Sequence, residues 1–308
     1  MPLTLGIASP SYSGHIPGSD TEHITWLLDR CVEYGLQSLQ WGGLPLAEPE
    51  LVAEKARTAG VKLVPFWNHI DLVTPEVKDG GVEGLKKIAE HDFDTAARAG
   101  IKTIVIHGGG HDHFTKDPPL PEQISRMITN LGPVAAAAAE RGLQLGLLPH
   151  LDYRSYDLLE VMHGVNNPAL RMAFDTTNSF PTAEDPLDAA RNCLPYAVDV
   201  ALKEVRLYPN NSNRATIMGK PIGDGSVGFE NILPLLHQLL PDPDNTSCHI
   251  KLRLPPDTTL ADTHAWMSRS LNYLRGYDLF PQLEGKTHEE LECRSVGRSG
   301  DFTTDAKL

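Results

Sequence analysis

The sequence predicts an α/β fold, a (β/α)8 TIM barrel, from three observations. The chain has 308 residues, close to the usual size of one such barrel. Short apolar runs, typical of strands buried on both faces, alternate with amphipathic helices. Several predicted helices end at a glycine, which adopts the left-handed conformation at little steric cost and turns the chain back. We therefore expect one barrel domain over residues 1–280.

The predicted elements follow one another in regular order. Gly35, Gly60, Gly100 and Gly142 each end a helix and precede a predicted strand. The eight expected strands cover residues 3–8, 38–41, 63–66, 103–107, 145–148, 170–175, 198–206 and 249–254. No GxGxxG motif follows the first strand, and Gly108-Gly109-Gly110 is not a Walker loop. A closed barrel is therefore preferred to an open, doubly wound sheet.

The two ends of the chain and its cysteines indicate the compartment. Residues 281–308 are polar and lack periodicity, so we expect a C-terminal tail or flap laid on the barrel. The first residues do not have the pattern of an export signal, and no window is apolar enough for a membrane span. Four scattered cysteines without a CxxC pair argue against a zinc finger or a disulfide framework. We expect a cytoplasmic protein with no membrane partner.

The charge balance limits the classes of partner. The formal net charge is -13, from 40 acidic and 27 basic side chains. Nucleic-acid binding needs clustered Lys and Arg to neutralise phosphates, so a nucleic-acid partner is not expected. The composition suits an enzyme for a small, sugar-like molecule, and a homo-oligomer is compatible with it.

Polar side chains gather where the predicted strands end, which is where barrel enzymes carry their chemistry. These residues are Trp67, Asn68, His69, His107, His150, Asp152, Asp175, Thr176, Thr177, Asn178, Lys203, Glu204, Arg206, His249, Lys251 and Arg253. Asp175 is the strongest candidate, because a buried carboxylate without a partner is costly. His69 could instead hydrogen-bond backbone at the barrel mouth. Strand parity favours an outer-face ion pair between Glu204 and Arg206.

Four segments carry a resemblance to a known superfamily over about residues 3–276. They are Val105-Ile106-His107-Gly108-Gly109, Phe174-Asp175-Thr176-Thr177-Asn178, Leu202-Lys203-Glu204 and Gly223-Asp224-Gly225-Ser226-Val227-Gly228-Phe229. In this order and spacing they resemble the sugar phosphate isomerase/epimerase superfamily of xylose isomerase-like barrels. That superfamily includes xylose isomerase, ketose 3-epimerases, inosose dehydratase and endonuclease IV.

The resemblance also implies a metal site from which this sequence departs. Epimerase-type members hold Mn²⁺ or Mg²⁺ with Glu, Asp, His and Glu at the ends of strands five to eight. Asp175 matches the family aspartate, but Leu148, Ala201 and Lys251 stand at the other three positions. Hard divalent ions require several oxygen ligands, so no metal or other cofactor is expected, and any divalent ion would have an incomplete ligand set.

The leading hypothesis is an enzyme that moves a proton next to the carbonyl of a sugar or polyhydroxy compound. The reaction would be an isomerisation, an epimerisation or a β-elimination. Asp175 or His150 would be the base, and Lys203 and Lys251 would stabilise the enediolate. A lysine of lowered pKa could also form a Schiff base, and simple pairing of both lysines with Asp175 is the structural alternative. The expected substrate-binding residues are Trp41, Trp67, His69, His107, Asn178 and Arg253.

Three alternatives remain open at this stage. The barrel could have lost catalysis with its ligands and serve as a binding or accessory subunit. A nitrogen-rich centre for Zn²⁺ or Fe²⁺ could form from His69, His107, His150 and Asp175. Endonuclease activity is disfavoured, because its three-metal cluster needs more ligands and the net charge is wrong.

Overall fold

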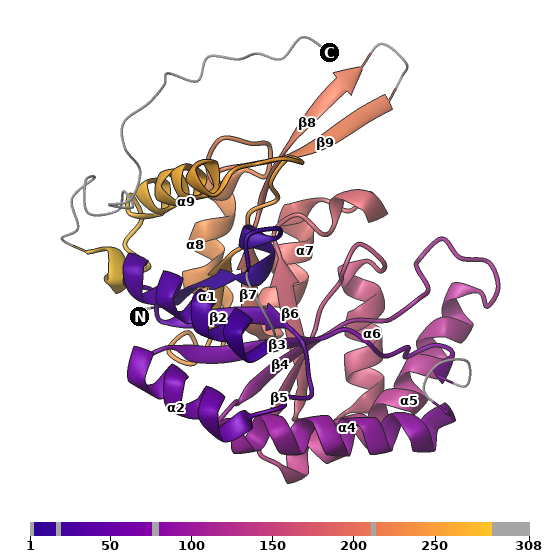
Figure 1. Cartoon of the computed structure of the whole chain (residues 1–308). Coiled ribbons are helices and arrows are strands. Elements are labelled where there is room, and N and C mark those ends of the chain that lie inside the picture. The colour runs from indigo at the N-terminus through magenta and orange to yellow at the C-terminus, as the bar shows by residue number, and fades with distance from the viewer. Residues whose placement is uncertain (1–2, 17–19, 76–79, 211–213, 285–308) are drawn as a thin grey trace.

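The predicted barrel is confirmed by the structure, a computed structural model that describes residues 3–16, 20–75, 80–210 and 214–284. Eight parallel strands close in the order β1-β10-β7-β6-β5-β4-β3-β2 (Figure 1). They are β1 (Thr4–Ala8), β2 (Ser38–Gly42), β3 (Lys62–Trp67), β4 (Thr103–Ile106), β5 (Gln144–Leu147), β6 (Leu170–Asp175), β7 (Ala197–Leu202) and β10 (Ser247–Ile250).

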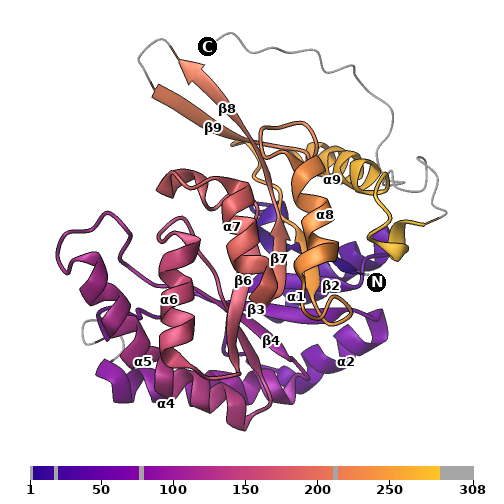
Figure 2. The same ribbon diagram turned by 180° about the vertical axis from the view of Figure 1, so that it is seen from behind.

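Helices pack around the outside of the barrel, as the two opposite views show (Figures 1 and 2). They are α1 (Asp20–Tyr34), α2 (Pro49–Ala59), α4 (Gly81–Arg98), α5 (Leu120–Glu140), α6 (Ser155–Val165), α7 (Pro186–Cys193), α8 (Phe229–Leu239) and α9 (Leu260–Leu274). The four junction glycines, Gly35, Gly60, Gly100 and Gly142, all have positive φ, between 64° and 73°. The glycine signal in the sequence therefore marks true helix ends.

The barrel interior is apolar on one side and polar on the other. Val64, Val105, Leu148 and Ala173 form a buried cluster inside the barrel, with Phe66 packed against it. Opposite them lies a buried polar group in which Ser38 Oγ is 2.8 Å from His249 Nε2. His249 Nδ1 is 2.9 Å from Asp199 Oδ1, and Gln40 Nε2 donates to Asp199 Oδ2 at 2.7 Å. Side-chain alternation then directs the next inward residues of the strands to the carboxyl mouth.

The prediction of one strand over residues 198–206 is wrong. The barrel strand β7 ends at Leu202, and two further strands, β8 (Glu204–Asn210) and β9 (Arg214–Lys220), pair in antiparallel fashion as a hairpin. The hairpin projects beyond the barrel in both views (Figures 1 and 2). Because it follows β7 directly, its base lies at the carboxyl end of the barrel.

The predicted ion pair between Glu204 and Arg206 is also wrong. Glu204 is buried, and its carboxylate accepts hydrogen bonds from the backbone N–H groups of Val205, Gly223 and Val227 at 3.0, 3.3 and 3.2 Å. A Cβ on Gly225 would lie 2.2 Å from Glu204 Oε1. The glycine-rich segment 223–228 therefore packs around the Glu204 carboxylate. Its hydrogen bonds connect the base of the hairpin to the residues just before α8.

The remaining predictions about the ends and cysteines are tested only in part. Among the described residues, no helix is long and apolar enough to cross a membrane. Cys31, Cys193 and Cys248 are buried and free, whereas Cys293 lies outside the described residues. Of the expected tail, only residues 281–284 are described, with a short 3-10 helix at Pro281–Leu283. The rest, 285–308, lies outside the described residues.

Candidate active site

A cavity of about 480 Å³ opens at the carboxyl ends of the strands. Five residues for which the sequence predicts a catalytic or substrate-binding role line it: Trp41, His150, Lys203, Lys251 and Arg253. A second, larger cavity of about 740 Å³ lies where the strands begin, around Lys62, Lys102 and Ser247. We place the site in the smaller cavity, because barrel enzymes carry their chemistry at the carboxyl face.

One buried carboxylate holds two ammonium groups at the floor of the smaller cavity. Asp175 Oδ2 lies 3.1 Å from Lys203 Nζ and 3.3 Å from Lys251 Nζ. Its other oxygen accepts hydrogen bonds from the backbone N–H and the hydroxyl of Thr177, at 3.0 and 3.1 Å. Lys203 Nζ also donates to Asn178 Oδ1 at 2.6 Å. Both oxygens of Asp175 are therefore occupied by donors.

The same contacts set the charge states of these groups. Burial would by itself raise the pKa of Asp175, but the ammonium groups of Lys203 and Lys251 outweigh it and hold the pKa at about 2. Burial lowers the pKa of Lys203 to about 8, against the opposing effect of Asp175. At neutral pH, Asp175 is a carboxylate and Lys203 is mostly protonated.

Three aromatic rings meet on the opposite wall. The ring of Phe66 lies 5.1 Å from His150 and 5.4 Å from His107, and the two imidazoles are 5.2 Å apart. Burial lowers the pKa of His150 to about 4, and the positive charge of Lys251 adds to this effect. His150 is therefore a neutral imidazole at pH 7, with access to the cavity.

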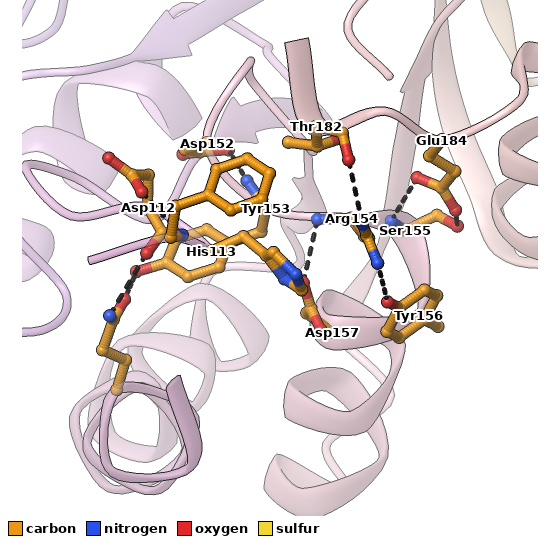
Figure 3. Close-up of polar contacts among 12 residues, drawn as sticks. Asp112, His113, Asp152, Tyr153, Arg154, Ser155, Tyr156, Asp157, Thr182 and Glu184 are labelled. Carbon is orange, nitrogen blue, oxygen red and sulfur yellow. Dashed lines mark hydrogen bonds and ion pairs between the residues drawn. The ribbon is translucent and has the colours of Figure 1, made fainter. Parts of the chain in front are cut away.

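The turn that carries His150 is fixed by hydrogen bonds, and Figure 3 shows the segment that continues it, from Asp152 to Asp157. Asp152 Oδ1 accepts from the backbone N–H groups of His150 and Tyr153, at 2.7 and 2.8 Å. Between them Leu151 has φ of 68°, a conformation that costs a non-glycine residue about 1–3 kcal/mol. Further along, Asp157 accepts from Arg154 N at 2.9 Å and lies 2.7 Å from His113 Nδ1. The Asp152 carboxylate thus holds the strained turn, and the Asp157 carboxylate holds the start of α6 that follows it.

We expect Asp152→Ala to release this turn. Losing the acceptor for two backbone N–H groups should lower the free energy of unfolding by about 1–3 kcal/mol and weaken ligand binding through His150. Asp152→Asn keeps one amide oxygen in place of Oδ1 and is the matched control. Urea unfolding and calorimetric binding measure both effects, and equal behaviour of the Ala and Asn variants would contradict the role of this oxygen.

Two residues expected to bind substrate lie elsewhere. The Trp67 side chain is fully buried, and its Nε1 donates to Asp92 Oδ2 on α4 at 2.7 Å. His69 Nε2 lies 3.1 Å from the same carboxylate oxygen. Neither residue lines the cavity. Both side chains therefore contact Asp92 on the outer side of β3, away from the cavity.

The other expected residues meet at the mouth, and some contributors had no clear signal in the sequence. Asn178 is buried under Lys203, and His107 contacts His150 without lining the cavity. Asn68 and Thr177, which were expected at strand ends, also line the cavity. Gln40, Phe66 and Ile217 line it as well and were not expected. Gln40 and Phe66 could have been found from strand parity, since each faces inward near a strand end. Ile217 comes from the unpredicted hairpin.

The residues at the mouth do not fit the divalent ion that the resemblance implies. No group of three or more His, Cys, Asp or Glu side chains suited to a metal occurs in the part of the chain that the structure describes. Leu148 and Ala201 offer no donor atom, and the Lys251 ammonium lies against Asp175, the one carboxylate among the four implied ligand positions. The alternative nitrogen-rich centre is not formed either, because His69 pairs with Asp92 instead.

Comparisons with known proteins place the chain in a family. A D-allulose 3-epimerase from Methylomonas sp. in complex with D-allulose has TM-score 0.64 and 14% identity, over 85% of this chain and 88% of that chain. An L-ribulose 3-epimerase has TM-score 0.66 and 16% identity, over 86% of each chain. A xylose isomerase domain protein from Planctomyces limnophilus has TM-score 0.64 and 19% identity, over 89% of this chain and 95% of that one.

At these identities the likeness to solved structures is one of fold. No curated protein sequence matches the chain. A family model described as a xylose isomerase-like TIM barrel matches residues 28–269. Because this match spans most of the chain, the protein belongs to the xylose isomerase-like TIM barrel family.

Proposed function

We propose that this protein is an enzyme that moves a proton next to the carbonyl of a sugar or related polyhydroxy compound. The product would be an isomer, an epimer or an elimination product. One observation carries the proposal: two ammonium groups held on the Asp175 carboxylate share a cavity with the neutral imidazole of His150. This arrangement combines a fixed positive charge with a proton acceptor.

The two lysines supply the electrostatic part of the mechanism. Removal of a proton next to a carbonyl leaves negative charge on the carbonyl oxygen, and preorganised cations stabilise that charge in the transition state. Lys203 and Lys251 reach the cavity from two neighbouring strands and are held by the same oxygen of Asp175. In this proposal they stand where related enzymes hold a divalent ion, and no step requires a metal.

His150 is the proposed base, in preference to Asp175. Both oxygens of Asp175 already accept hydrogen bonds or ion pairs, and its pKa of about 2 makes it a weak proton acceptor. His150 is uncharged at pH 7 and lines the cavity. We therefore assign Asp175 the role of anchoring the two lysines, and His150 the role of proton transfer.

The rest of the cavity suits a sugar. Its volume of about 480 Å³ lies within the range of small-molecule pockets. Trp41 and Phe66 offer apolar surface, while Gln40, Asn68 and Thr177 offer groups that can bond hydroxyls. The epimerases of similar fold, which act on allulose and ribulose by their names, support a sugar-like substrate. The buried free cysteines support the proposal of a cytoplasmic enzyme.

Solvent deuterium exchange tests the proposed function. The purified protein is incubated in D₂O with a panel of ketopentoses, ketohexoses, the corresponding aldoses, their phosphates and sugar-derived keto acids, and the compounds are followed by NMR. Deuterium should enter at the carbon next to the carbonyl of at least one compound. His150→Gln, similar in size but not a base, should abolish this exchange. Sugar binding without exchange would contradict the proposal and favour a non-catalytic binding barrel.

The exchange rate should follow a bell-shaped pH profile. His150, with a pKa of about 4, must lose its proton to act, so the rate should rise through that pH. Lys203, with a pKa of about 8, must keep its proton, so the rate should fall above that pH. Lys203→Arg should remove the alkaline limb, because a guanidinium stays protonated there. The exposed control Lys87→Arg should leave both limbs unchanged, and an unchanged alkaline limb in Lys203→Arg would refute the assignment.

A further inference from the structure

The charges of the cavity wall have one sign. Three cationic side chains line the cavity, Lys203, Lys251 and Arg253. Among the residues that the structure describes, no Asp or Glu lines it, because Asp175 lies fully buried beneath the two lysines. The whole chain, in contrast, carries a formal net charge of -13. The net negative charge repels anions at long range, whereas the three cations give this cavity a local field that attracts them.

Arg253 differs from the two lysines in its pairing. Lys203 and Lys251 are both in contact with Asp175, which neutralises part of their charge. Arg253 is exposed and makes no ion pair with a carboxylate among the residues that the structure describes. Its charge is nevertheless close enough to contribute to the lowered pKa of Lys203. Arg253 is thus a cation of the cavity wall that no carboxylate of the described residues pairs with.

The backbone of Arg253 is held in place by the hairpin. A Cβ on Gly219 of β9 would lie only 1.6 Å from the carbonyl oxygen of Arg253. The absence of a side chain at Gly219 therefore lets β9 pack directly against the segment that carries Arg253. Gly219 and Ile217 of the same strand also line the cavity. This close backbone packing suits a residue that must hold a ligand in one orientation.

We propose that Arg253 binds an anionic group of the substrate, so that the substrate is a sugar acid or a phosphorylated sugar. The inference rests on the proposed function: the carbonyl lies at Lys203 and Lys251, and the anionic group lies at Arg253 nearer to solvent. A guanidinium binds a carboxylate or a phosphate through two parallel N–H donors, which fixes the direction in which the substrate enters. The positive charges of Lys203 and Lys251 then stabilise the negative charge that develops on the carbonyl oxygen.

Calorimetric titration with unreactive analogues tests this proposal. The probes are a panel of aldonates such as D-gluconate, alditol phosphates such as D-sorbitol 6-phosphate, and the neutral alditols such as D-sorbitol. At least one anionic probe should bind tenfold or more tightly than the alditol of the same configuration, as expected for a charged hydrogen-bonded pair (about 1.5–3 kcal/mol). The preference between aldonates and phosphates identifies the anionic group.

Arg253→Gln should remove this preference, so that the anionic probe binds no more tightly than the neutral alditol. Arg57→Gln is the matched control, since it makes the same charge change at the opposite end of the barrel. Equal binding of anionic and neutral probes, no binding of any anionic probe, or an unchanged preference in Arg253→Gln would each overturn the proposal.

The failure of this inference is distinguishable from the failure of the proposed function. Deuterium exchange into a neutral ketose, with no preference for anionic probes, would overturn the anion site and leave the proposed reaction standing. Arg253-dependent binding of aldonates, with no exchange into any keto acid or sugar phosphate, would support the anion site and overturn the reaction.

Discussion

Lys251→Met is expected to lower the rate of proton exchange by about 100- to 1,000-fold, the usual cost of removing one donor that stabilises an oxyanion. Methionine matches the length of the lysine stem but carries no charge. The Lys251 ammonium lies 3.3 Å from Asp175 Oδ2 and lines the cavity, so its loss removes positive charge from the proposed position of the carbonyl oxygen. Exchange into the substrate found by NMR measures the effect.

The control for this variant is Lys102→Met, at the exposed start of β4 and on the opposite cavity. It makes the same charge change outside the proposed site and should keep the full exchange rate. Circular dichroism and urea unfolding establish that both variants fold. A folded Lys251→Met protein that exchanges at the native rate would remove Lys251 from the mechanism.

Asp175→Asn is expected to lower the free energy of unfolding by about 3–5 kcal/mol at pH 7, because it leaves two ammonium groups in a buried site without a counter-charge. The side chain of Asp175 is fully buried, and those of Lys203 and Lys251 are only 11% and 12% exposed. Asparagine has nearly the same size and shape as aspartate, so the lost free energy of unfolding measures the effect of the charge rather than of packing. Urea unfolding measures it.

A second substitution separates this charge effect from a local distortion. Asp175→Asn combined with Lys203→Met removes one of the unpaired cations and should recover a large part of the lost stability, so that the two substitutions are not additive. The stability of Asp175→Asn should also recover as the pH rises, because burial lowers the pKa of Lys203, Asp175 no longer raises it, and Lys203 therefore loses its proton in the folded protein before it does in the unfolded chain. Additive losses and a pH-independent deficit would show that the three groups do not act as one unit.

Much of the fold was predictable because barrel strands and helix ends leave local signals. The junction glycines all have positive φ, and the predicted strands at residues 63–66 and 170–175 lie within or match β3 and β6. The hairpin was not predictable, because residues 204–206 continue the strand-like pattern of β7 with no glycine or proline at the junction. Its stabilising contacts join Glu204 to backbone amides about twenty residues later, beyond any local pattern.

The candidate site was predictable at strand ends and less so beyond them. His150, Lys203 and Lys251 reach the mouth because each lies two residues beyond an inward-facing residue of its strand. Trp67 follows Phe66, which takes the inward position, so the indole turns outward to Asp92. The local sequence does not predict the contact between Trp67 and Asp92 on α4, because the two residues are 25 positions apart.

In the proposed mechanism, two lysines anchored on Asp175 stabilise the developing negative charge without a divalent ion. This is tested by measuring the metal content of the purified protein and its deuterium exchange rate before and after dialysis against EDTA. We expect no stoichiometric Mn²⁺ or Mg²⁺ and an exchange rate that neither chelation nor added metal changes. One divalent ion per chain, whose removal stops exchange and whose return restores it, would contradict this mechanism.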